Sequence, residues 1–145
     1  MSLKINQSDL AKLKSKLNNL RAFDKKTLSK ELGRTALEIA RKAKQNAPVD
    51  KGTLKQSIRA EVRGKTVEVI AGASYAPYIE FGTGRLVSLD DMLELGIPAS
   101  YAEQFKGKGL KNVNLPARPF FFSSAREGLK DLLVRLNNEL NKAIK

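Results

Sequence analysis

Residues 54–72 carry the pattern that most restricts the fold of this chain. Apolar and polar side chains alternate over residues 58–62 and again over residues 67–71. The intervening residues 63–65 read Arg-Gly-Lys, a composition typical of a turn. Period two on both sides of a turn indicates paired antiparallel strands with one buried face. The sequence therefore predicts a β-hairpin within 54–72, with charged side chains on its outer face.

Helical periodicity dominates both ends of the chain. Leucines at positions 10, 13, 17 and 20 share one helical face, with lysines between them. A second helix is expected to begin after Asp24 and to end before Pro48, because the residue before a proline is driven out of the α region. We therefore place two helices within residues 8–47. Ser124 and Glu127 have the spacing of a capping box, which predicts a last helix that continues to residue 144.

The stretch between the hairpin and the last helix is less regular. Residues 82–116 form a long connection with two short candidate helices, and connections of this length in compact domains are usually functional. Residues 117–122 read Ala-Arg-Pro-Phe-Phe-Phe, a short aromatic run typical of a strand. The predicted architecture is one α+β domain over residues 1–145. Its small antiparallel sheet, made of the hairpin and this returning strand, packs with the N-terminal helices and the C-terminal helix.

The chain contains no cysteine and no histidine, which removes much of catalytic chemistry. Disulfides, thiolate nucleophiles, cysteine–histidine zinc sites and imidazole bases are excluded. Asp90, Asp91 and Glu94 could hold a hard cation, but acidic residues in a first helical turn more simply favour the helix dipole. We expect no enzyme activity, metal or cofactor. No segment has the apolar length of a signal peptide or a membrane span, so we expect a soluble intracellular protein without membrane contact.

Positive charge exceeds negative charge by a wide margin. The 27 lysines and arginines against 15 acidic residues give a formal net charge of +12. Most of the excess lies in residues 1–73, on the N-terminal helices and the hairpin. Such a balance points to a negatively charged partner, whether nucleic acid, acidic protein or anionic lipid. A small basic nucleic-acid-binding protein is one interpretation, with phosphate contacts from the basic patch Lys12, Lys14, Lys16, Arg21, Lys25 and Lys26.

Two aromatic segments are only partly explained by burial in a core. Residues 75–81 read YAPYIEF, and a single helical turn would align their three aromatic rings. A core cluster does not explain why Glu80 stands in the middle of that segment. Residues 117–125 read ARPFFFSSA, and in a strand Phe121 would point away from its two phenylalanine neighbours. An apolar side chain on an outer face is either covered by a helix or available to a partner.

Three blocks in order resemble the signature of one protein family. They are APVDKGTLKQSI over residues 47–58, YAPYIEFGTG over residues 75–84 and ARPFFFSSA over residues 117–125. Together they are similar to the gene-product-ten-like family of tailed bacteriophages, described as head–tail joining, tail-completion or minor tail components. The order and spacing of the blocks match, and the resemblance extends over essentially the whole chain. It implies an origin in a phage or a prophage.

The resemblance implies assembly rather than catalysis. It implies a homo-oligomeric ring, a hexamer in the virion, next to connector, tail-tube and tail-terminator proteins. The basic excess adds the expectation of a transient DNA contact. The expected location is the neck or tail of the virion, and the host cytoplasm during assembly. The motif residues to which this assembly role is assigned are Pro48, Asp50, Gly52, Leu54, Ile58, Tyr75, Tyr78, Glu80, Phe81, Gly82, Thr83, Gly84, Arg85, Arg118, Pro119, Phe120 and Phe121.

Overall fold

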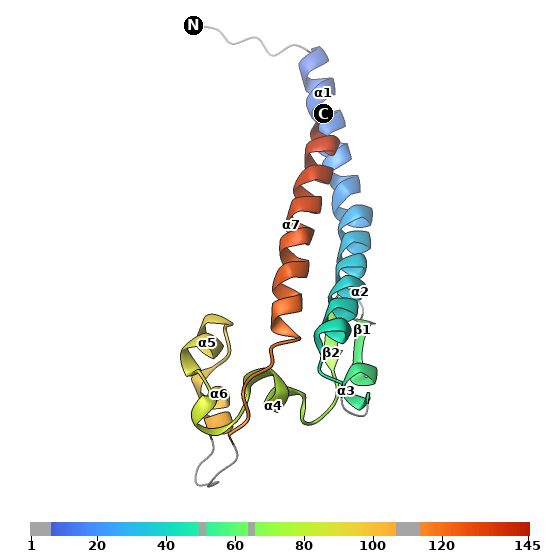
Figure 1. Cartoon of the computed structure of the whole chain (residues 1–145). Helices are drawn as coiled ribbons and strands as arrows, with labels where there is room; N and C mark the ends of the chain where they lie inside the picture. The colour runs from blue at the N-terminus through green and yellow to red at the C-terminus, as the bar shows by residue number, and fades with distance from the viewer. Residues whose placement is uncertain (1–6, 50–51, 64–65, 107–113) are drawn as a thin grey trace, which may run out of the picture.

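A long helical arm and a second helix beside it make up the most extended part of the molecule (Figure 1). The computed structural model describes residues 7–49, 52–63, 66–106 and 114–145. The elements of the arm follow one another without a break: α1 (Gln7–Ala22), the π-helical turn η1 (Phe23–Thr27) and α2 (Leu28–Asn46). The predicted second helix, expected to begin after Asp24, is α2, but the sequence did not show that it continues directly from α1. The amide of Leu28 donates to the carbonyl of Phe23, five residues back, so the helix widens at this point and continues.

The last helix, α7 (Phe122–Ile144), runs antiparallel to the arm: its first part packs against α2 and its end lies beside α1. Its Arg135 donates to Glu31 at 2.7 Å, to Thr35 at 2.7 Å and to Glu38 at 3.1 Å. Glu31 and Thr35 are buried. These charge-assisted bonds fix the register of the two helices, because a shift of either helix would leave buried polar groups without partners.

Close approach of the two helices depends on a residue without a side chain. Gly128 in α7 lies directly against Ile39 of α2, and a Cβ at this position would collide with the Ile39 side chain. Nearby, Asn46 donates to the hydroxyl of Ser124, and that hydroxyl donates to the carbonyl of Phe120. Ser124 is thus a buried bridge between the helices. It is not the predicted capping residue, because α7 already begins at Phe122.

The predicted hairpin is confirmed. Strands β1 (Ile58–Arg63) and β2 (Thr66–Ala71) pair antiparallel, with Ile58 opposite Ala71 and Arg63 opposite Thr66. The start of the predicted range, however, is a single helical turn, α3 (Thr53–Ser57). The turn residues Gly64 and Lys65 lie outside the described residues.

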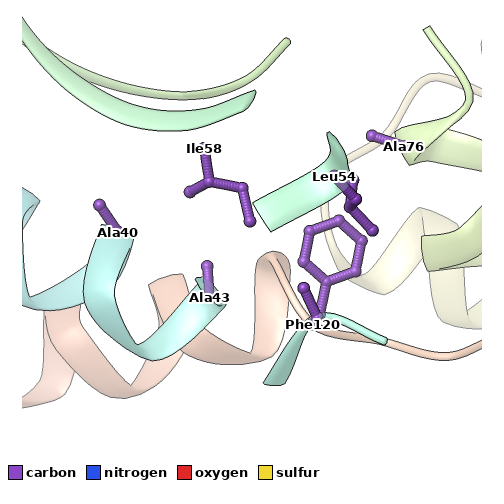
Figure 2. Packing of buried hydrophobic residues seen from close by; sticks show 7 residues of the cluster. Ala40, Ala43, Leu54, Ile58, Ala76 and Phe120 are labelled. Atoms are coloured by element: carbon purple, nitrogen blue, oxygen red, sulfur yellow. The ribbon is translucent and has the colours of Figure 1, made fainter. Parts of the chain in front are cut away.

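The main core lies where the hairpin covers α2. Small side chains on α2 allow the strands to approach its backbone, and larger side chains from the hairpin, α3 and the start of α7 fill the remaining space. The members of this cluster are Ala40, Ala43, Ala47, Leu54, Ile58, Ala76 and Phe120 (Figure 2). Phe120 is 1% exposed. The chain segment before α7 is therefore anchored in the core by one aromatic ring.

Residues after the hairpin form a lobe of short helices. Its elements are α4 (Ala76–Phe81), the 3-10 turn η2 (Gly84–Leu86), α5 (Leu89–Glu94) and α6 (Ala99–Lys106). The lobe has its own buried cluster, which consists of Phe81, Val87, Met92, Ile97, Ala102 and Phe105. Contact between the rings of Phe81 and Phe122, with centroids 5.7 Å apart, joins this cluster to the beginning of α7.

The α+β class is confirmed, but the predicted returning strand is wrong. In the described part of the chain the sheet consists of β1 and β2 alone. Residues 114–120 belong to no helix or strand, Phe121 already has αR backbone angles, and Phe122 belongs to α7. The backbone amides that a strand would need donate elsewhere: Arg118 to the carbonyl of Ile79 at 2.8 Å, and the three phenylalanines to Glu80.

Candidate functional site

Glu80 is the centre of the site, and its geometry explains its place in an aromatic segment. It lies on α4 and is only 4% exposed. Its carboxylate accepts from the amides of Phe120 at 2.7 Å, Phe121 at 2.9 Å and Phe122 at 3.0 Å. These are the free amides at the start of α7, where the helix dipole favours a negative charge. We call the carboxylate and these three amides the Glu80 cap.

The chain just after Glu80 is held to the segment before α7 by two hydrogen bonds. The amide of Thr83 donates to the carbonyl of Leu115 at 2.9 Å, and the amide of Leu115 donates to the Thr83 hydroxyl at 3.1 Å. Gly82 lies between these contacts with φ +74°, and a Cβ there would be 2.5 Å from the Leu115 carbonyl oxygen. Only glycine satisfies both the backbone conformation and the close approach.

The three sequence blocks meet in space beside the Glu80 cap. Pro48, Leu54, Tyr75, Ile79 and Arg118 surround a surface depression of about 480 Å³. At this depression and in the Glu80 cap, residues from all three blocks lie together in one structural unit. The blocks thus contribute to one joint between α2, α4 and the start of α7.

The predicted motif residues separate into three groups by exposure. Those at the centre of the joint are buried: Leu54, Ile58, Glu80, Phe81, Gly82 and Phe120. Those at its edge are partly exposed: Pro48, Gly52, Thr83, Gly84 and Phe121. Those on the surface are Tyr75, Tyr78, Arg85, Arg118 and Pro119. Asp50 lies outside the described residues.

An apolar groove of about 560 Å³ opens on another side of the joint. It is lined by β2, α4, the phenylalanines at the start of α7, and the lobe. From the lobe come Leu95, Ile97, Pro98 and Tyr101, which the sequence analysis did not single out. Among the described residues that line it, Glu80 is the only charged one, and its oxygens already accept three amides. We call this the lobe groove; it suits an apolar surface better than a charged ligand.

The basic patch lies far from this site, on α1 and η1. Lys12, Lys14, Lys16, Arg21 and Lys26 are exposed, and the side chain of Lys25 is outside what the structure describes. None of these five described side chains forms a salt bridge. The patch and the joint are therefore separate features of the surface.

The acidic residues considered as possible cation ligands lie on α5 (Leu89–Glu94). Asp90 and Asp91 occupy the first turn of α5, where the Ser88 hydroxyl accepts from the Asp91 amide as a helix cap. Within the described ranges, no group of three or more acidic side chains is arranged to hold a metal ion. The helices described likewise include none with the length and apolar composition that crossing a bilayer requires.

Comparison with known proteins gives one match. Residues 11–82 match a family model described as "Bacteriophage HK97-gp10, putative tail-component". This range contains the first sequence block and residues 75–82 of the second, and it ends at Gly82, beside the Glu80 cap; the third block lies beyond it. Comparison with curated proteins and with solved structures gives no significant match.

Proposed function

We propose that this chain completes the phage tail and joins it to the head. The proposal starts from the finding that the chain belongs, over residues 11–82, to the HK97-gp10-like family of phage tail components. Family membership confirms the resemblance seen in the sequence and indicates a structural component of the virion. The finer proposal is a non-enzymatic ring protein of the neck, assembled in the host cytoplasm beside connector and tail-terminator proteins.

The observation that supports this proposal best is the lobe groove. Enzyme sites combine apolar walls with a few convergent polar groups. Here the one carboxylate at the groove serves as a helix cap, so its oxygens are already occupied by backbone donors. What remains accessible is apolar and aromatic surface, which is typical of a protein–protein contact.

A closed ring needs two different complementary surfaces on each subunit, repeated head to tail. The lobe groove is our candidate for one of them. The other would supply apolar side chains from outside the groove, and Val62 in β1 and Leu133 in α7 are exposed by 73% and 67%. Such a ring forms either from the isolated protein or on contact with a neighbouring component of the particle.

A groove variant provides the direct test. Tyr101 lines the groove and is 43% exposed, so Tyr101→Glu places a charge on the contact surface. It also removes an edge-to-face contact with Phe105, whose ring centroid lies 5.4 Å away, and this costs about 0.5–1.5 kcal/mol. Leu93→Glu is the matched control, because Leu93 is 48% exposed on the same lobe but outside the groove lining. We expect wild type and the control to form rings, alone or with the tail-tube protein, in solution mass measurements, and Tyr101→Glu to remain a monomer.

A deletion in the phage tests the function itself. Without this protein, electron microscopy should show assembled tail tubes that fail to join filled heads. Normal infectious particles from the deletion would refute the proposed role, and unchanged rings in Tyr101→Glu would refute the groove as the contact surface.

A further inference from the structure

The four leucines of α1 form a narrow apolar stripe that the described part of the chain covers only in part. Leu10, Leu13, Leu17 and Leu20 are spaced by three, four and three residues, as at the a and d positions of a coiled coil. Leu10, Leu13 and Leu17 are 53%, 55% and 51% exposed. We call these four residues the α1 seam. Two heptads with half-exposed a and d leucines have the form of an incomplete helix–helix contact.

Helix α7 does not complete that contact, because it ends alongside the middle of α1. Figure 1 shows the first turns of α1 extending past the end of α7. A shallow groove of about 530 Å³ at this point is lined by Leu13 and by Lys12, Lys16 and Lys145. The seam therefore continues beyond its own intramolecular neighbour onto a surface where lysines gather.

Charges beside the seam define which helix would fit. With Leu10 and Leu17 at a, the e and g positions within residues 9–23 are Asp9, Lys14, Lys16, Arg21 and Phe23. Three of these five are basic: Lys14, Lys16 and Arg21. All three are exposed and none forms a salt bridge in the described structure. Residues at e and g contact the partner helix and decide its identity through charge. A partner with acidic residues at its own e and g positions would be complementary.

We infer that the α1 seam binds an acidic amphipathic helix of a neighbouring assembly protein. This inference rests on the proposed function and adds the chemistry of one partner. A second α1 fits less well, because basic e and g residues would face each other across the contact. DNA offers no apolar surface to the leucines. An apolar stripe this narrow, with cations on both flanks, also differs from the broad apolar face of a membrane-surface helix.

Two synthetic helices test the inference against the full chain. Both have three heptads with leucine at a and d; one has glutamate at e and g, and the other has lysine. We expect the glutamate helix to bind roughly tenfold more tightly or better in fluorescence anisotropy, with a smaller difference at high salt. Equal affinity, or a preference for the lysine helix, would overturn the inference.

Charge reversal locates the contact. The combined variant K14E/K16E/R21E should reverse the preference, so that the lysine helix binds more tightly. The control K44E/R126E/K130E changes the net charge equally, at exposed residues of α2 and α7 that form no salt bridge in the described structure. Its preference should stay that of wild type; a reversal in the control as well would show that net charge decides binding, and the inference would fail.

An apolar variant and two other ligands complete the test. Leu13→Ser should weaken the glutamate helix about fivefold, with an unchanged circular dichroism spectrum, because half of this side chain is already in water. A short DNA duplex and phosphatidylcholine–phosphatidylglycerol vesicles should bind more weakly than the glutamate helix. Tighter binding of either, lost in K14E/K16E/R21E, would assign the patch to phosphates instead.

The outcome of these helix-binding tests can be distinguished from the outcome of the tests of the proposed function. If rings form and join tails while neither synthetic helix discriminates, only the α1 inference fails. If the helices discriminate as expected while the phage deletion yields normal particles, the neck role fails and the binding preference of the seam stands.

Discussion

Removal of the Glu80 carboxylate should destabilise the fold more than any other single change to a carboxylate on the lobe. In Glu80→Ala, the amide of buried Phe120 is left without an acceptor, while those of half-buried Phe121 and Phe122 can turn to water. An unsatisfied buried donor costs about 1–3 kcal/mol. Loss of a negative charge at a partly buried helix N-terminus adds up to about 2 kcal/mol. The free energy of unfolding should therefore fall by about 3–4 kcal/mol.

Glu80→Gln separates the hydrogen bonds from the charge. One carboxylate oxygen accepts from two amides and the other from one, so the glutamine carbonyl can keep the first pair. The third amide then faces an NH₂ group, and the charge is lost. We expect a decrease of about 1–2 kcal/mol, clearly smaller than for alanine.

Equilibrium urea denaturation followed by circular dichroism gives these free energies. Glu103→Gln is the matched control, since Glu103 is an exposed residue of α6, and it should change the free energy of unfolding by less than about 0.5 kcal/mol. If Glu80→Ala were as stable as this control, the carboxylate would not be the cap of α7, and the structural role assigned to Glu80 within residues 75–84 would be wrong.

Three further predictions follow from single positions. Gly82→Ala should reduce the free energy of unfolding by at least about 2 kcal/mol in urea denaturation, because φ is +74° and the new Cβ would meet backbone. Gly128→Ala should destabilise by about 1–3 kcal/mol through overlap with Ile39, whereas Gly33→Ala, with no atom within 4 Å of its Cβ, should stabilise by about 0.5–1 kcal/mol; equal effects would contradict the packing argument. Burial raises the pKa of Glu38, but hydrogen bonds and charges from two arginines outweigh it and hold the pKa below 4.5. Since the ionised form favours the fold, this contribution is present above pH 4.5 and is lost as the pH falls through the lowered pKa. Wild type should therefore lose more stability than Glu38→Gln in urea titrations below pH 4.5, and parallel losses would show that the ion pair contributes nothing.

Local periodicity was sufficient to predict the hairpin and the helical ends. Alternation over residues 58–71 depends only on which face of the strands is buried, and the same holds for the leucine spacing of α7. Periodicity could not show that the chain passes through residue 24 without a break. A π-helical turn shifts the helix by one residue and uses only backbone bonds, so it has no marker in residue types.

The Glu80 cap could be anticipated only in part. The sequence marked Glu80 and Phe121 as unusual, but it could not connect them, because the donors are backbone amides that every residue except proline carries. The same fact explains the error about the returning strand. Aromatic residues favour strands, but here their backbone amides donate to a carboxylate forty residues away in the sequence instead of to a neighbouring strand. The lobe groove was missed because Ile97 and Tyr101 lie in short helices whose packing depends on distant contacts.

The joint and the two proposed contact surfaces should respond differently to mutation. The joint is buried, and its residues satisfy backbone groups from three segments, so a change there lowers stability first and assembly only as a consequence. Tyr101 and Leu13 are exposed by 43% and 55%, so their replacement should lower the free energy of unfolding by less than about 1.5 kcal/mol, even with loss of the Tyr101–Phe105 ring contact. A loss of assembly in either surface variant with the fold retained therefore reports on a contact. The same loss in Glu80→Ala reports on the fold, and measurement of both quantities in each variant distinguishes a partner surface from the scaffold that holds it.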